Sequence, residues 1–441
     1  MAILNHCNPR LVALVVSILC VISPGSPHAA EEKLSGEFVI HKALPAVERL
    51  NFANHLWNCN RGWTGGEGFS RREQLDPDKG QVDAMGYPVL EEGGQATTQL
   101  AVPTSGARAL LTGRMTVTWR GAAAVDVTGG ATVAERADRR LEVDVTDTFE
   151  LTVTAGSRFA TNPIRHLRVW APDPRDPATK SLAPGEGEKE PVFHPTYLEY
   201  WRLRGVGVWR MAWAQFNNNP QETWEHTRHP DHCFMMGSVP RKPIPGREHR
   251  SDVMNEVAWQ HCVTLANELD VDIWLNIPHG AKDEYVRDLA RLMLFGADEN
   301  GKPYSKPQAD AAYPALNPKH KVYVELSNEM WHSGFHQGIV MYKLHERLNI
   351  PWGAAPARRV SEMWSLFQDE FQKAGQDWKT RLVRVAACSD NRVAWTREFV
   401  DEAMAYGATL RDLRPGETVG GGVYTQATRP DVLAAANYFG N

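Results

Sequence analysis

The stretch from Val322 to Phe335, VYVELSNEMWHSGF, combines a structural signal with a chemical one. It opens with a short apolar run rich in β-branched and aromatic residues, which predicts a buried strand. The run ends at Asn328 and Glu329, and Trp331 follows closely. The sequence therefore predicts an amide and a carboxylate at the point where a strand runs out.

Runs of the same kind recur towards the C-terminus and alternate with helical stretches. Six predicted strands are centred near residues 166, 207, 272, 323, 383 and 433. Buried strands in a β-α series predict a parallel sheet. Because no Gly-rich phosphate loop follows any of them, a closed barrel is favoured over an open nucleotide-binding sheet. We therefore predict an α/β fold whose main part is a TIM-type (β/α)₈ barrel, incomplete at six strands.

Polar and aromatic side chains gather at the predicted carboxyl ends of these strands, which in a barrel form the face that carries the active site. Arg210 lies within an apolar strand, where an unpaired charge is costly, so it should have a carboxylate or ligand partner. His279 is either a site residue or a hydrogen-bonded loop histidine. The candidate site residues at these strand ends are Arg210, Trp213, Asn276, His279, Asn328, Glu329, Trp331 and Tyr438.

The rest of the chain divides into shorter regions. Residues 1–30 resemble a signal peptide, because Arg10 precedes an apolar run and Ala29-Ala30 offer a cleavage site. They predict export to the periplasm, cell envelope or medium. Residues 31–95 are irregular, whereas residues 96–160 alternate apolar with polar residues and predict a small β-sandwich-like region. Residues 161–441 make up the partial barrel.

The composition limits the classes of partner. A net charge of −5 gives no electrostatic reason to expect nucleic acid, and after the signal no stretch is long and apolar enough to span a membrane. Four cysteines remain after the signal, which permit a disulfide without defining its pairing. The chain holds 15 tryptophans. Trp213 and Trp331 could either pack in the core or stack on sugar rings.

One histidine-rich segment, HTRHPDHC, holds residue types that can bind zinc. It brings His226, His229, His232 and Cys233 close together in the sequence. However, Pro230 interrupts any helix, and the spacing fits no structural zinc pattern well. We predict neither a metal nor a cofactor.

The motif of Asn328 and Glu329 after a strand counted as the fourth resembles the clan A (β/α)₈ glycoside hydrolases. The segments VWRMAW and LANELDVDIWLNIPH also resemble a family of exported bacterial proteins. The clan resemblance implies that Glu329 is the general acid/base and that Asn328 contacts the sugar 2-hydroxyl. It further implies that Arg210 supports the nucleophile and that Tyr438, on the sixth strand, bonds to it.

The sequence departs from the pattern of the clan in its second carboxyl group. Glycoside hydrolysis uses two carboxyl groups, and the clan places its nucleophile at the end of a seventh strand. Since the predicted strands stop at six, we expect a truncated chain that lacks the second carboxylate of the usual pair and is inactive as given. The ordinary alternatives are that Glu329 begins a helix and that Asn328 caps it.

The sequence therefore supports two hypotheses for the function. The first is an exported glycoside hydrolase-like protein that acts on a polysaccharide or oligosaccharide through carboxylate acid/base chemistry. The alternative is a non-catalytic carbohydrate-binding or cell-envelope protein. The sugar, the linkage and the oligomeric state are not defined by the sequence.

Overall fold

The structure is a computed structural model of the 441-residue chain. It describes residues 34–37, 53–54, 64–65, 75–76, 79–103, 108–211, 219, 221–235, 238–239, 254–255, 257–389 and 391–436. The chain forms two compact units. The parallel unit comprises Met1–Phe38, Gly205–Thr227 and Cys262–Asn441, and the antiparallel unit comprises Val39–Arg204 and Arg228–His261. The predicted signal peptide lies outside the described residues.

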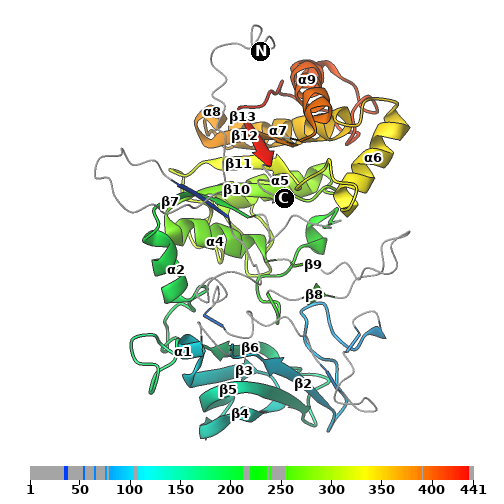
Figure 1. The fold of residues 1–441 in the computed structure, drawn as a ribbon. Coiled ribbons are helices and arrows are strands. Elements are labelled where there is room, and N and C mark those ends of the chain that lie inside the picture. Colours follow the sequence, from blue (N-terminus) through cyan, green and yellow to red (C-terminus); the bar gives the residue numbers. More distant parts are fainter. Residues whose placement is uncertain are drawn as a thin grey trace. The chain divides into compact units, whose positions relative to one another are not determined.

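The parallel unit is built on a six-stranded sheet (Figure 1). Its strands, in spatial order, are β1 (Leu34–Glu37), β7 (Val206–Arg210), β10 (Asp272–Ile277), β11 (Val322–Leu326), β12 (Leu382–Ser389) and β13 (Val432–Ala436). All neighbouring pairs are parallel. Helices occupy the connections, as parallel pairing requires. They are α4 (Trp259–Leu269), α5 (Asp283–Phe295), α6 (His336–Leu348), α7 (Ala354–Lys373), α8 (Trp378–Arg381) and α9 (Val393–Thr409).

The antiparallel unit holds a five-stranded sheet in the order β2-β5-β3-β6, with β4 paired to β5. Its elements are β2 (Gln95–Leu100), α1 (Arg108–Leu111), β3 (Gly113–Arg120), β4 (Ala123–Ala137), β5 (Arg140–Ala155), β6 (Arg165–Trp170), α2 (Pro195–Arg202), β8 (Ser238–Val239) and β9 (Met254–Asn255). Strand β5 alternates buried and exposed residues, as a sheet with one covered face should. Its buried members Leu141, Val143 and Leu151 belong to the hydrophobic core of this unit.

The predicted fold class is wrong. The described residues form two curled half-barrel sheets, one parallel and one antiparallel, and not an incomplete (β/α)₈ barrel preceded by a β-sandwich. The strand near residue 166, counted as the first of the barrel, is β6, which pairs antiparallel with β3. The first position of the parallel sheet is taken by β1, which pairs with β7. The β-rich region forms one curled sheet, where a sandwich needs two.

This error has a physical cause. A short, largely buried strand such as β6, RHLRVW, carries no pattern that separates a parallel from an antiparallel partner. Strand β1 has the sequence LSGE, whose Gly and Glu are poor strand formers, so no pattern marks it. The chain between β1 and β7 contains most of the antiparallel unit.

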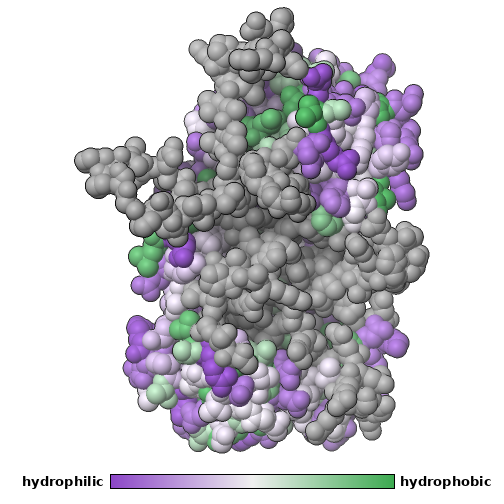
Figure 2. Space-filling model, viewed as in Figure 1, coloured by the Kyte–Doolittle hydropathy of each residue, from purple (hydrophilic) through white to green (hydrophobic). Residues whose placement is uncertain are grey.

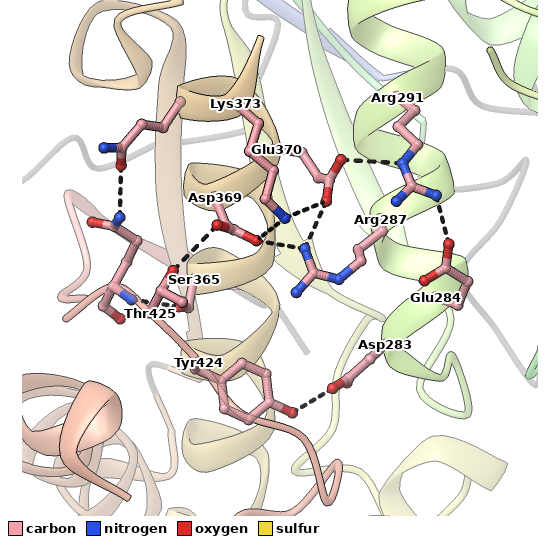
Figure 3. Close-up of polar contacts among 12 residues, drawn as sticks. Asp283, Glu284, Arg287, Arg291, Ser365, Asp369, Glu370, Lys373, Tyr424 and Thr425 are labelled. Atoms are coloured by element: carbon pink, nitrogen blue, oxygen red, sulfur yellow. Dashed lines mark hydrogen bonds and ion pairs between the residues drawn. The ribbon is translucent and has the colours of Figure 1, made fainter. Parts of the chain in front are cut away.

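Helices α5 and α7 are joined by an ion-pair network (Figure 3). Arg287 of α5 donates to both Asp369 and Glu370 of α7, at 2.6 Å each. Arg291, one turn further along α5, donates to the second oxygen of Glu370 and to Glu284. Arg287, Arg291 and Glu370 each take part in more than one of these pairs. Networks of this kind contribute more to stability than isolated surface pairs.

Hydrophilic residues predominate on the visible surface of helices α6 and α9 (Figure 2). None of the helices in the described part of the chain combines the length and the hydropathy that crossing a bilayer requires. Among the described residues no disulfide forms, and Cys262 and Cys388 are buried. Burial raises the pKa of the Cys388 thiol to about 12, so this thiol is not a nucleophile near neutral pH.

Candidate functional site at the carboxyl end of β11

The pairing register places several polar side chains on one face of the parallel sheet. In the register, Trp274 of β10 lies between Arg210 of β7 and Tyr323 of β11. Asn276 and Glu325 are neighbours one pleat further along β10 and β11. Because side chains alternate between the faces of a strand, all five project from the same face, and Arg210, Asn276 and Glu325 lie towards the carboxyl ends of their strands. A charged pair is thus brought together from residues more than a hundred positions apart.

Arg210 and Glu325 form a bidentate ion pair. The Arg210 Nε and Nη2 atoms donate to the two carboxylate oxygens of Glu325 at 3.1 and 2.9 Å. The Trp274 indole N–H donates to the same carboxylate at 2.7 Å, and the guanidinium lies 5.4 Å from the Trp274 ring. Glu325 is only 1% exposed. Burial of a carboxylate is tolerated here because donors meet both of its oxygens.

The same guanidinium extends the cluster to Asn328. Arg210 Nη2 donates to Asn328 Oδ1 at 3.0 Å, which fixes the orientation of that amide. Gln337 Nε2 donates to the Asn328 carbonyl at 2.8 Å, and Asn276 Nδ2 donates to the Ser327 carbonyl at 2.7 Å. We refer to Arg210, Trp274, Glu325 and Asn328 as the Arg210 cluster. The segment after β11 is therefore tethered by side chains from several elements.

This tethered segment has a strained backbone. Ser327 and Glu329 have φ values of 51° and 46°, in the left-handed region that residues with a Cβ rarely adopt. Such outliers cost about 1–3 kcal/mol each and cluster at functional sites. Glu329 is partly exposed, whereas its neighbours Ser327 and Met330 are buried. The strained segment thus holds a partly exposed carboxylate directly after a residue whose amide Arg210 orients.

The helix-start alternatives for Asn328 and Glu329 are wrong. Helix α6 begins at His336, seven positions after Glu329, and its N-cap residue is Phe335. Asn328 therefore caps no helix, and Glu329 lies in the loop between β11 and α6.

His279 follows β10 and contacts the first residue of α6. Its Nε2 lies 2.9 Å from His336 Nδ1, and the rings meet edge to face. Burial first, and the neighbouring His336 second, lower the pKa of His279 to about 3, so its imidazole is neutral near pH 7. This contact joins the loop after β10 to the helix that follows the Glu329 loop.

Of the other predicted site residues, two are buried and two lie outside the described residues. Trp331 is 4% exposed and packs edge to face on Trp395 of α9, which is the core-packing alternative and leaves it no open face for a sugar. Asn276 is fully buried and holds the Ser327 carbonyl, so it positions the loop. Trp213 and Tyr438 lie outside the described residues.

Sequence reasoning missed Glu325 and Trp274. It predicted that Arg210 needs a carboxylate or ligand partner, and this is confirmed, but it did not name the partner. The signal was present, because Glu325 is a charge inside an apolar strand just as Arg210 is. The two cannot be paired without the register of β7, β10 and β11.

The histidine-rich segment makes backbone contacts. His226 Nδ1 accepts from the Glu222 N–H, His229 Nδ1 accepts from the Asp231 N–H, and His232 Nδ1 lies 2.8 Å from the Phe234 carbonyl. Within the described ranges no group of three metal-ligating side chains converges.

Gly338 of α6 allows the Glu329 loop to lie against the helix. A Cβ added there would overlap the His332 carbonyl, which is backbone and cannot swing aside. Glycine-to-alanine changes within helices normally stabilise by about 0.5–1 kcal/mol. We expect Gly338→Ala to do the opposite and to lower the free energy of unfolding by about 1–3 kcal/mol. Urea denaturation measures this, with the exposed α6 change Glu346→Ala as the control; a stabilised Gly338→Ala protein would contradict the packing described.

Comparison with protein-family models, with curated proteins and with solved structures finds no match to this chain.

Proposed function

We propose that the chain is an exported glycoside hydrolase-like protein that acts on an oligosaccharide or polysaccharide, with Glu329 as its general acid. The observation that carries this proposal is the strained segment after β11, in which the partly exposed Glu329 directly follows Asn328, whose amide Arg210 orients. β11 is also the fourth strand in the order of the parallel sheet. The signal-like sequence of residues 1–30 supports export.

The proposed chemistry assigns a role to each group. Glu329 donates a proton to the glycosidic oxygen as the bond to the leaving sugar breaks, and a water molecule adds its hydroxyl group to the anomeric carbon and releases its other proton to solvent, from which Glu329 is reprotonated. Asn328 binds a sugar hydroxyl through its amide, whose orientation Arg210 fixes. Glu325 is a positioning residue, because donors occupy both of its oxygens and it is buried.

A second function is favoured because Glu325 is buried and donors occupy both of its oxygens. Hydrolysis needs a second carboxylate as nucleophile or base. Glu325, the other carboxylate of this group, is held by Arg210 and Trp274 and cannot reach a sugar carbon without breaking those contacts. Carbohydrate binding without turnover is therefore the alternative function.

The test compares Glu329→Gln with the matched change Glu346→Gln on the exposed face of α6. Both proteins are assayed for release of reducing ends from a panel of plant, algal and bacterial glycans, and for binding by glycan array. We expect Glu329→Gln to lower turnover of a responsive glycan at least about 100-fold while binding persists. Glu346→Gln should behave as the unmodified chain does.

Three results would change the proposal. Undiminished hydrolysis by Glu329→Gln would remove Glu329 from the mechanism. Binding without turnover in the unmodified chain would establish the alternative function. Failure to bind any glycan would reject both functions.

A further inference from the structure

A cavity of about 500 Å³ lies within the parallel unit, beside the loop that follows β10. Its volume falls in the usual range of small-molecule sites. One wall comes from α6 and includes the apolar Val340, Met341 and Leu344. The lining also includes His279, Arg359 of α7 and the Val419–Gly420 segment.

The charged residues that line this cavity are all basic. Lys282, Lys343, Arg347 and Arg359 line it, and none of the described residues that line it is acidic. Arg359 is already neutralised, because it donates to Asp283 and Glu362. Lys282 makes one exposed pair with Glu222, of the kind that contributes little.

Lys343 and Arg347 are the two cations available to a ligand. They lie four residues apart, on one face of α6, and are exposed. Within the described part of the chain neither makes an ion pair with a carboxylate. Two neighbouring cations over an apolar wall favour an anionic group carried on a body with an apolar face.

We propose that this cavity binds an acidic sugar, with Lys343 and Arg347 on the carboxylate. The inference rests on the proposed function for its link to carbohydrate, and it narrows the substrate class to glycans that carry uronic acids. The apolar side chains of α6 would contact the less polar face of the sugar ring.

The experiment uses the full chain and measures the Kd of short glucuronate- and galacturonate-containing oligosaccharides by calorimetry. Their methyl esters, which lack the charge, are the matched neutral ligands, and inorganic phosphate is the competitor. The variant is Lys343→Met with Arg347→Met. The control, Lys306→Met with Arg397→Met, removes the same charge from exposed positions outside the cavity.

We expect the unmodified chain and the control to bind the acids about 10- to 100-fold more tightly than the esters. The variant should lose this preference and still bind the esters. Equal binding of acid and ester, an unchanged preference in the variant, or no binding of any uronate would overturn the inference. Full displacement by equimolar phosphate would also overturn it, because the cavity would then be a phosphate site.

These outcomes separate the two proposals. Tight binding of uronates without turnover would support the cavity and reject hydrolysis by Glu329. Hydrolysis of neutral glycans that depends on Glu329, with no preference for uronates, would support the enzyme and reject the cavity.

Discussion

Glu325→Gln is expected to lower the free energy of unfolding by about 3–5 kcal/mol, because it removes the charge that neutralises Arg210 inside the sheet. Glu325 is 1% exposed, and Arg210 reaches it with two hydrogen bonds. Glutamine keeps the size of the side chain, but its NH₂ group would face a donor of Arg210 or Trp274. The loss therefore exceeds that of an ordinary neutral hydrogen bond.

Urea denaturation followed by tryptophan fluorescence measures this change. The double change Arg210→Met with Glu325→Met is the informative control, since an apolar pair leaves no charge buried. We expect it to be more stable than Glu325→Gln alone. A loss below about 1 kcal/mol for Glu325→Gln would show that the pair is well solvated. If Asn328 binds substrate, Glu325→Gln should also weaken glycan binding, because Arg210 no longer holds the Asn328 amide.

The behaviour of individual strands shows how far sequence patterns reach. Strands β7, β10, β11, β12 and β13 were predicted near their observed positions, since each buries an apolar run. β6 was assigned to the wrong sheet because a buried run does not reveal its partner. β1 was missed because LSGE has no apolar pattern, and its place in the sheet comes from pairing with β7.

The candidate site also combines features that the sequence predicts with features that it does not predict. The strand-end position of Asn328 and Glu329 follows from the sequence, because the apolar run before them is unambiguous. The left-handed conformations of Ser327 and Glu329 do not, since neither residue type favours them and tertiary contacts impose them. Trp331 is of the residue type that often stacks on sugar rings, and yet it packs on Trp395. No local sequence pattern could reveal this contact.

A second buried carboxylate, Glu362 of α7, is not exposed at all. It accepts hydrogen bonds from the Tyr406 hydroxyl, the Arg359 guanidinium and the Tyr424 hydroxyl. The backbone N–H groups of Val419 and Gly420 donate to it as well, at 2.6 and 2.8 Å. Glu362 thereby fastens the loop that precedes β13 onto α7, next to the Tyr424–Asp283 contact (Figure 3).

Changing Glu362 to glutamine should lower the free energy of unfolding by about 3–5 kcal/mol and release the Val419–Gly420 loop. A glutamine amide has one acceptor oxygen, whereas five donors converge on this position, so at least one buried donor loses its partner. Urea denaturation gives the global loss, and amide hydrogen exchange at Val419 and Gly420 gives the local one. Glu417→Gln, at a solvent-exposed ion pair with Arg414, should cost less than about 1 kcal/mol.

The two readouts distinguish a fastening role from a merely buried charge. If Glu362 fastens the loop, exchange at Val419 and Gly420 should accelerate even in urea too dilute to unfold the chain. If both amides stay protected while the protein is destabilised, the loop is held by its other contacts, such as Ser365 Oγ to the Gln426 carbonyl. Because Val419 and Gly420 also line the cavity beside His279, release of the loop should weaken uronate binding in the same variant. A stability loss below about 1 kcal/mol would mean that water replaces the five donors without difficulty.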